Sequence, residues 1–413
     1  MSQTPFNIQR AAVIGAGTMG RGIVMCLANA GVPVQWVDNN PQMLEQALAT
    51  VAETNAHNVR QGRIDQAEAD ARVARVTAAP DYVSIRDADL VIEAVYENLE
   101  LKQKIFRELD GLLKPEAILA SNTSALDIDA IAAVTGRSQQ VLGLHYFSPA
   151  HIMKLLEIVR GKDTDSQVLE VARSLARRTG KVAVVAGNCP GFIGNRMLRS
   201  YVAEARKLLL EGALPQQVDE ALQQFGFAMG PFRMYDVVGI DLEWRARHLA
   251  GQGMDAPLVQ VDNALCELGR LGQKTGAGYY RYAPGSRQAE HDPLVDEWVL
   301  KVSQGLGYRR REIDAREILD RCLLALVNEG AKILEEGIAA SSHDIDQVWL
   351  NGYGFPIETG GPMSWADEQG MNSLLTRLER LQGLFGEHWH PARLIPRLMA
   401  NGKRFADVGE GRV

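Results

Sequence analysis

The chain has 413 residues, which is long for one domain and fits two or three domains. Its hydrophobic content of 46% and charged content of 23% are ordinary for a globular protein, and the net charge of −7, with no long basic run, gives no sign of a nucleic-acid-binding surface. Because the first ten residues lack the apolar core of a secretion signal and no apolar run approaches the length of a membrane span, we expect a cytoplasmic protein that does not bind a membrane.

A glycine-rich turn follows the first strand-like segment, residues 11–14. Gly15, Gly17 and Gly20 have the GxGxxG spacing, and a helix-like pattern comes directly after them. In this motif the first glycine permits a tight turn, the second lets backbone amides approach a pyrophosphate, and the third lets the helix pack on the strand. Glycine-rich turns are common, so the spacing alone leaves a chance turn as the alternative.

The second strand-like segment, residues 32–38, ends in an acidic residue about twenty positions after the turn. A carboxylate at Asp38 would bind a ribose 2′-hydroxyl and repel a 2′-phosphate, which favours NAD over NADP. The helix N-terminus at Thr18 and Met19 would supply N–H groups and a positive dipole end to the pyrophosphate. With Asp38 counted, the pattern predicts NAD as the cofactor.

Strand-like and helix-like segments alternate through the first half of the chain. The strand-like runs lie at residues 11–14, 32–38, 89–95, 117–121, 141–147 and 181–186. Such alternation is typical of a mostly parallel, doubly wound α/β sheet. We therefore predict a Rossmann-type NAD-binding domain over residues 1–187.

Two helical blocks follow the predicted sheet. Residues 188–283 form the first, residues 284–313 are interpreted as a linker because they are polar and contain prolines, and residues 314–413 form the second. Residues of the first block recur in order in the second: Arg196, Glu204 and Glu211 recur as Arg321, Glu329 and Glu336, and Gly226, Phe227, Gly230, Pro231, Asp236 and Gly239 recur as Gly354, Phe355, Gly361, Pro362, Asp367 and Gly370. The ordered series predicts two duplicated all-α domains, with chance matching of helical sequence as the alternative.

Polar residues follow several of the predicted strands. Ligands of open α/β sheets bind outside the carboxyl ends of the strands, so these residues would rim one crevice. Besides the glycine turn and Asp38 they are Glu93, Glu97, Asn122, Thr123, Ser124 and His145. Oxidation of an alcohol by hydride transfer needs a base for the hydroxyl proton, and a histidine that titrates near neutrality suits this task. Of the eight histidines, His145 is the one at such a position.

A second residue of interest is Glu157, which lies in the apolar run 155–159. An unpaired buried charge is costly, so a carboxylate among strand-like hydrophobic residues needs a partner. The N–H group of His145 would satisfy it, and the carboxylate would in turn fix the tautomer and stabilise the imidazolium formed in turnover. The alternative is that the two are separate structural residues.

Three segments carry a resemblance to a known family: residues 121–128 (SNTSALDI), 143–159 (GLHYFSPAHIMKLLEIV) and 188–196 (NCPGFIGNR). Together they strongly resemble the L-3-hydroxyacyl-CoA dehydrogenase family, over nearly the whole chain. The tail, with residues 272–280 and 352–363, is similar to the dehydrogenase half of multifunctional β-oxidation enzymes, whose enoyl-CoA hydratase domain has no counterpart in this sequence.

The resemblance implies NAD-dependent oxidation of an L-3-hydroxyacyl-CoA to the 3-oxoacyl-CoA, with an acyl-CoA as substrate. It implies that His145 is the general base and Glu157 its orienting partner. Ser124 would hydrogen-bond the reacting region of the substrate, and Asn195 would contact the substrate near the base. The alternatives are that Ser124 caps the following helix, as a Ser-x-x-Asp pattern can, and that Asn195 is a helix-surface residue.

The family positions near the cofactor match Glu93, Lys102 and Asn122. The alternative for Lys102 is a solvated lysine on an amphipathic helix. His151 follows His145 closely, but no cluster of ligand spacing accompanies it, so no metal is predicted. The resemblance also implies that the helical domain closes over the crevice and helps to cover the acyl-CoA.

The second helical block departs from the first where Asn195 aligns with Asp320. Because the substrate asparagine is lost there, we expect the second copy to be structural. Simpler family members dimerise through their one helical domain, so we expect a monomer with an internal pseudo-dimer, and docking to a separate hydratase or thiolase stays open. The rival functions are dehydrogenation of a non-CoA hydroxy acid or sugar acid, and a non-catalytic NAD-binding structural protein.

Overall fold

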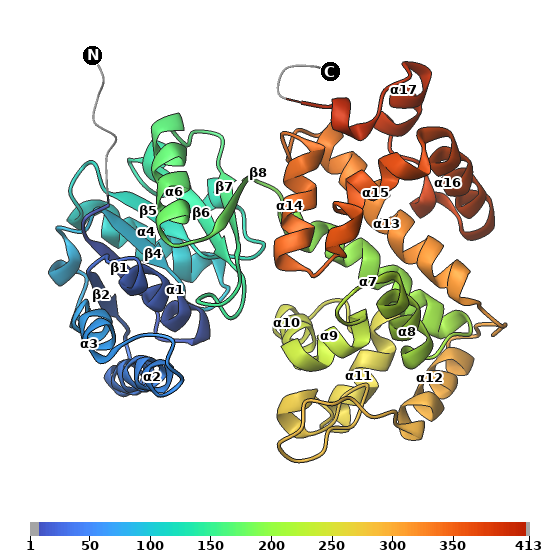
Figure 1. Cartoon of the computed structure of the whole chain (residues 1–413), viewed down its shortest axis with the longest axis horizontal. Coiled ribbons are helices and arrows are strands. Elements are labelled where there is room, and N and C mark those ends of the chain that lie inside the picture. Colours follow the sequence, from blue (N-terminus) through green and yellow to red (C-terminus); the bar gives the residue numbers. More distant parts are fainter. Residues whose placement is uncertain (1–7, 410–413) are drawn as a thin grey trace. The chain divides into compact units, whose positions relative to one another are not determined.

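The computed structural model describes residues 8–409 and divides into two compact units (Figure 1). The sheet unit runs as far as Asn195 and also takes in the segment Glu336–Tyr353, and the helical unit comprises Arg196–Glu335 and Gly354–Val408. Within residues 8–409, none of the helices has both the length and the apolar character that a membrane crossing requires. The domain boundaries expected from the sequence stay predictions. The segment 336–353, which those boundaries assign to the second helical block, lies with the sheet.

The sheet unit contains one sheet of eight strands in the order β3-β2-β1-β4-β5-β6-β7-β8. The strands are β1 (Ala11–Ile14), β2 (Val34–Val37), β3 (Val76–Ala78), β4 (Leu90–Glu93), β5 (Ile118–Ser121), β6 (Val141–Tyr146), β7 (Leu155–Arg160) and β8 (Val182–Gly187). All neighbours are parallel except β6 and β7. The predicted mostly parallel α/β sheet is confirmed.

Two strands were missing from the sequence-based prediction. β3 has three residues and only the first is buried, so it carries too little pattern to be recognised. β7 is an apolar run interrupted by Glu157, and it was not counted among the strands although its hydrophobic residues are strand-like. Its antiparallel pairing with β6 places Glu157 directly opposite His145.

One face of the sheet packs against helices in a large hydrophobic core. This core combines inward-facing strand residues such as Val13, Ile92 and Leu144 with apolar side chains of α1, α2 and α6. The α-helices of the unit are α1 (Thr18–Asn29), α2 (Pro41–Arg60), α3 (Gln66–Ala74), α4 (Leu99–Leu112), α5 (Ile128–Ala132), α6 (Ser166–Arg178) and α14 (Ser342–Gly352). Every residue of β1, β4, β5 and β6 is buried, as is typical of a parallel sheet that is covered on both faces.

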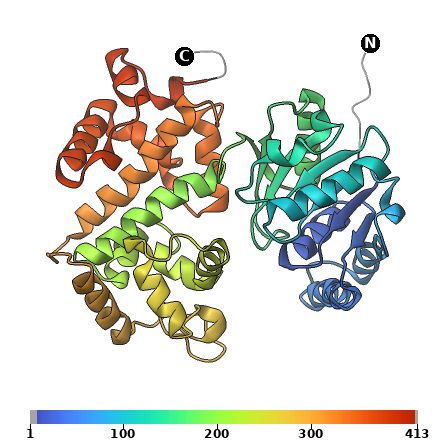
Figure 2. The same ribbon diagram turned by 180° about the vertical axis from the view of Figure 1, so that it is seen from behind.

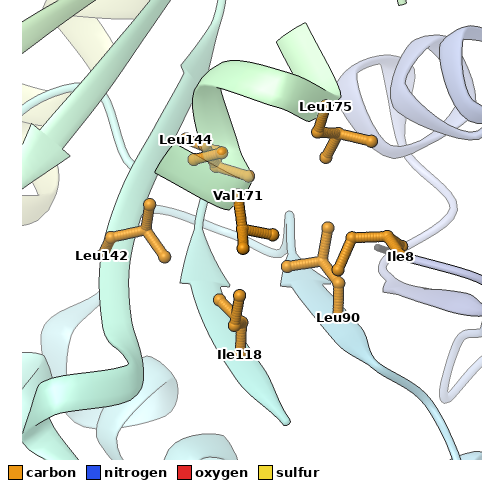
Figure 3. A pocket seen from close by; sticks show the side chains of 8 residues that line it. Ile8, Leu90, Ile118, Leu142, Leu144, Val171 and Leu175 are labelled. Carbon is orange, nitrogen blue, oxygen red and sulfur yellow. The ribbon is translucent and has the colours of Figure 1, made fainter. Parts of the chain in front are cut away.

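A small cavity lies inside this core, between α6 and the strands (Figure 3). Its lining is entirely apolar: Ile8, Leu90, Ile118, Leu142, Leu144, Val171, Ala172 and Leu175. Cavities of this kind stay dry because they offer water no hydrogen-bond partner. The cavity is a packing defect of the core and offers no polar group to a cofactor or substrate.

The free edge of the sheet at β8 is covered by the segment 336–353. The N–H of Gly187 donates to the carbonyl oxygen of Ile338 at 2.7 Å, and Ala186 forms an isolated antiparallel bridge with Ala339. Helix α14 then packs on β7 and β8 (Figure 1). An unpaired edge strand is a site for unwanted pairing, so this segment gives the sheet a protected edge.

The helical unit contains the remaining helices. They are α7 (Gly194–Glu211, which starts in the sheet unit), α8 (Pro215–Phe225), α9 (Pro231–Val238), α10 (Asp241–Ala250), α11 (Gln260–Glu267), α12 (Pro293–Gly305), α13 (Ala315–Glu335), α15 (Pro362–Gln369), α16 (Met371–Phe385) and α17 (Leu394–Ala400). The interpretation of residues 284–313 as a linker is wrong in part, because α12 lies there. Its Pro293 occupies the first helical position behind the capping Asp292, a place where proline favours a helix.

The duplication is visible in paired charges across α7 and α13, which lie side by side (Figure 2). Arg196 Nε lies 2.7 Å from Glu329 Oε1, and Arg321 Nε lies 2.9 Å from Glu204 Oε2. Arg196 corresponds to Arg321 and Glu204 to Glu329, so each arginine pairs with the glutamate of the other copy. Such reciprocity is the signature of a two-fold interface.

Candidate active site

The glycine turn joins β1 to α1 at the carboxyl end of the central strand. Gly15 has φ +108°, and a Cβ there would lie 2.6 Å from the carbonyl oxygen of Ala94. A Cβ on Gly20 would lie 1.9 Å from the carbonyl oxygen of Gly15, so helix and strand approach too closely for any side chain. Gly17, in contrast, has no neighbour within 4 Å among the described residues, and no described side chain caps α1. The uncapped N–H groups and the open space at Gly17 suit an anion.

Asp38 follows β2 and lies against this turn. Its Oδ2 accepts from the N–H of Ala16 at 2.6 Å, and its Oδ1 accepts from the N–H of Asn40 at 2.8 Å. Thr18 is exposed and Met19 is half-buried in the first turn of α1. The structure therefore brings together all the residues that the sequence assigned to the pyrophosphate and ribose of the cofactor.

The different surroundings of two glycines give a test of this turn. We expect Gly17→Ala to weaken NAD binding about tenfold or more, because its methyl group would enter the space of the pyrophosphate, while the melting temperature stays unchanged. Gly15→Ala should weaken NAD binding and should also lower the melting temperature, because the backbone conformation of Gly15 and the Ala94 carbonyl exclude a side chain. NADH fluorescence titration and thermal unfolding measure the two effects. Wild-type affinity in Gly17→Ala would show that the turn does not hold the cofactor.

His145 and Glu157 face each other on neighbouring antiparallel strands. They are direct partners in the register of β6 and β7, and His145 Nδ1 lies 2.7 Å from Glu157 Oε2. The side chain of Glu157 is fully buried, and that of His145 is 7% exposed. The pairing suggested by the buried-carboxylate argument is therefore present in the structure.

The second carboxylate oxygen of Glu157 is held by the start of α7. Its Oε1 accepts from the N–H groups of Ile193 at 3.1 Å and Gly194 at 3.0 Å. The positive end of the helix dipole stabilises a negative charge at this place. Because both oxygens only accept, His145 Nδ1 must carry the proton, and Nε2 is the nitrogen that can receive one.

Aromatic rings surround the imidazole. Phe147 lies with its ring centroid 4.5 Å from that of His145, and Phe192 lies at 5.7 Å. Phe192 is fully buried and has φ +51°, a conformation that a residue with a side chain rarely adopts. Phe192 belongs to the loop before α7. Because its ring lies beside the imidazole, its strained backbone is close to His145. Sequence reasoning missed both rings, although they lie within the segments that carry the family resemblance.

Ser124 is held by a glutamate from another strand end. Glu97 Oε1 accepts from the N–H of Ser124 at 2.8 Å, from its hydroxyl at 3.1 Å and from the hydroxyl of Thr123 at 2.6 Å. The alternative that Ser124 caps the following helix is wrong, because Asp127 caps α5 by accepting from the N–H groups of Asp129 and Ala130. Glu97 was placed in the crevice from sequence, but its role in orienting Ser124 was not foreseen.

Glu93 and Lys102 form a buried ion pair beneath this network. Lys102 Nζ lies 2.6 Å from Glu93 Oε1, and the two side chains are 1% and 0% exposed. The other oxygen of Glu93 accepts from the hydroxyl of Ser121 at 2.7 Å, and Lys102 Nζ lies 3.6 Å from Glu97 Oε2. The alternative of a solvated Lys102 is therefore wrong. The pair ties β4, β5 and α4 together and supports the loop that carries Glu97.

The two asparagines bind to backbone near the strand ends. Asn122 Oδ1 accepts from the N–H of Tyr146 at 2.9 Å, which joins the end of β5 to the end of β6. Asn195 is half-buried, and its Nδ2 donates to the carbonyl oxygen of Ser124 at 3.4 Å. The structure thus places Asn195 beside Ser124 rather than on an outer helix surface.

Models of known families match most of the chain. Residues 10–189 match the NAD-binding domain of 3-hydroxyacyl-CoA dehydrogenase, and residues 191–282 and 318–412 match its C-terminal domain. The second model thus matches two separate segments, one in each helical block, which agrees with the duplicated helices.

Individual relatives extend this picture. The peroxisomal bifunctional enzyme of Danio rerio is 44% identical over 96% of this chain, and the fatty acid oxidation complex subunit alpha of Shewanella frigidimarina is 35% identical over 97%. The chain spans little more than half of these relatives, 57% and 56% of their lengths. The resemblance to the dehydrogenase portion of multifunctional β-oxidation enzymes is therefore confirmed.

Solved structures match over nearly the whole chain as well. The 3-hydroxybutyryl-CoA dehydrogenase of Escherichia coli has a TM-score of 0.82 at 28% identity and covers 96% of this chain and 100% of its own. The dehydrogenase part of multifunctional enzyme 1 from C. elegans has a TM-score of 0.69 at 28% identity and covers 95% and 90%. The chain belongs to the 3-hydroxyacyl-CoA dehydrogenase family, and its N-terminal part is the NAD-binding domain of that family.

Proposed function

We propose that this protein oxidises the 3-hydroxyl group of an L-3-hydroxyacyl-CoA to the 3-oxo group, as a step of β-oxidation type, with NAD as the oxidant. The observation that carries the proposal is the buried His145–Glu157 pair at the end of β6, which lies at the same edge of the sheet as the glycine turn after β1. Family membership supports the acyl-CoA substrate.

Gly15, Gly17, Gly20 and Asp38 would hold NAD, which would supply the acceptor for the hydride that leaves C3 of the substrate. His145 takes the hydroxyl proton on Nε2, because Nδ1 is engaged by Glu157. Glu157 keeps the imidazole in the required tautomer and stabilises the positive charge that it gains. The polar groups of Ser124 and Asn195 orient the substrate oxygen, as preorganised hydrogen-bond partners.

The remaining predicted cofactor residues act as supports in this proposal. Glu93 and Lys102 are buried and paired with each other, and Lys102 also approaches Glu97, so the pair holds the loop of Glu97 in place. Asn122 fixes the end of β6, the strand that carries His145. These contacts keep the base and Ser124 at fixed positions relative to the strand ends.

The proposed reaction is tested by NADH formation with a series of L-3-hydroxyacyl-CoA thioesters, from butyryl to palmitoyl chain length. NADP and free 3-hydroxy acids serve as controls. Turnover of one or more thioesters with NAD would support the proposal and give the chain-length preference. Turnover of free hydroxy acids alone would indicate a non-CoA substrate, and NAD binding without any turnover would indicate a non-catalytic protein.

We also propose that the protein is a monomer whose two helical copies form an internal pseudo-dimer. The reciprocal ion pairs Arg196–Glu329 and Arg321–Glu204 support it. A sedimentation mass near twice 45.3 kDa at micromolar concentration would contradict it.

The Shewanella relative is named as a complex subunit, which supports docking to a separate hydratase or thiolase, and co-purification tests this. The cytoplasmic location stays a prediction, as the Danio relative is named peroxisomal.

A further inference from the structure

Tyr353 follows α14 and belongs to the second helical block by sequence, yet it lies in the sheet unit, where it contacts Asn195 and Phe147. Its hydroxyl donates to Asn195 Oδ1 at 2.9 Å. Its ring stacks on Trp349 with the centroids 4.6 Å apart and meets Phe147 edge to face at 5.5 Å. Phe147 in turn packs on the imidazole of His145, so Tyr353 belongs to the packing around the base.

The contacts of Asn195 define which way its amide faces. The backbone carbonyl of Ser124 can only accept, so the Nδ2 group must be the end that points to it, at 3.4 Å. Oδ1 then points to the opposite side, where it meets the hydroxyl of Tyr353 as an acceptor. A rotated amide would lose the hydrogen bond to Ser124 and would bring two carbonyl oxygens together, whereas the Tyr353 hydroxyl could accept from the rotated NH₂ group. The Ser124 carbonyl thus selects the orientation of the amide, and the Tyr353 hydroxyl secures it by donating to Oδ1 on the opposite side.

The backbone of α7 is shaped for this contact. A Cβ on Gly194 would lie 2.5 Å from the hydroxyl oxygen of Tyr353, so the phenol can reach Asn195 only because residue 194 has no side chain. The N–H of Gly194 also donates to Glu157. One helical turn thus connects Tyr353, the amide of Asn195 and the carboxylate that orients His145.

We propose that Tyr353 is a positioning residue for the dehydrogenase reaction, which it serves by holding the Asn195 amide with Nδ2 as the donor to the substrate oxygen. The inference rests on the proposed function of this site. It gives the second helical block a part in catalysis, in place of the purely structural role expected from the loss of the asparagine at Asp320. The first copy supplies Asn195, and the second copy supplies the group that orients it.

The variant Tyr353→Phe removes the hydroxyl and keeps the ring with its aromatic contacts. We expect kcat/KM for the thioester to fall about tenfold, as for a lost hydrogen bond in an active site, with the KM for NAD and the melting temperature unchanged. Tyr146→Phe is the matched control. Its hydroxyl is buried, has no hydrogen-bond partner among residues 8–409 and lies on the other face of β6 from His145, so its loss should leave kcat/KM and the KM for NAD unchanged.

A double-mutant cycle separates positioning through Asn195 from a general structural effect. We expect Tyr353→Phe to have no further effect in an Asn195→Ala background, because the group that it orients is gone. Effects that multiply in the double variant, or wild-type kcat/KM in Tyr353→Phe, would overturn the inference.

A third measurement keeps the inference separate from the proposed function. If the wild-type protein oxidises no thioester, the proposed function fails. The NMR signal of the Asn195 side-chain amide then shows whether the Tyr353 hydroxyl holds that amide. This signal is assigned in protein labelled with ¹⁵N-asparagine by its loss in Asn195→Ala. A shift in Tyr353→Phe that is absent from Tyr146→Phe supports the contact, and an unchanged signal contradicts it.

Discussion

Replacing His145 with alanine is expected to lower kcat by between about a hundredfold and ten-thousandfold, the range of a positioned general base. The dissociation constant for NAD should stay the same. The imidazole stands on β6, whereas the glycine turn follows β1, and β4 and β5 lie between these two strands in the sheet. Steady-state turnover of the best thioester and NADH fluorescence titration measure the two quantities.

His151 offers a control within the same segment of the chain. It is exposed and lies only six residues after His145, so His151→Ala should keep the wild-type kcat. If His145→Ala bound NAD poorly but turned over normally at saturating cofactor, His145 would be a cofactor residue and not the base. If neither variant lost activity, the base would have to be another group.

The sequence indicated the chemistry at the strand ends because that information is local. A glycine turn, an acid after the second strand and a histidine at a strand end each lie within a few residues of the pattern that reveals them. Glu157 could be paired with His145 by a physical argument, since a carboxylate in an apolar run needs a donor. The antiparallel register that makes the two direct neighbours was not predicted, because β7 was not recognised as a strand.

Contacts between distant parts of the chain had no such local signal. Tyr353 and Asn195 are 158 positions apart, and nothing in either segment indicates that they meet. Lys102 was equally compatible with a solvated helix face, because only the folded structure shows the Glu93 carboxylate beneath it. The helix α12 was hidden by Pro293, which reads as a loop residue unless the capping Asp292 before it is taken into account.

Replacing Glu157 with glutamine tests the orienting role, and we expect it to lower kcat by between about a hundredfold and ten-thousandfold as well. The glutamine amide is fixed by the two N–H groups of Ile193 and Gly194, which need an acceptor and therefore keep Oε1 on their side. Its NH₂ group then faces His145 Nδ1 and can only donate. The imidazole must carry its proton on Nε2, the nitrogen that should receive the proton of the substrate.

The reverse orientation of the glutamine would lose both backbone hydrogen bonds in a fully buried place, at a cost of about 1–3 kcal/mol for each unsatisfied group. The orientation that preserves the start of α7 is therefore favoured, and we expect a melting temperature close to that of the wild type together with the loss of turnover. In a His145→Ala background the same substitution should have no further effect on kcat, because there is no imidazole left to orient. A Glu157→Gln protein with normal kcat, or an effect that persists without His145, would show that the carboxylate does not act through the histidine.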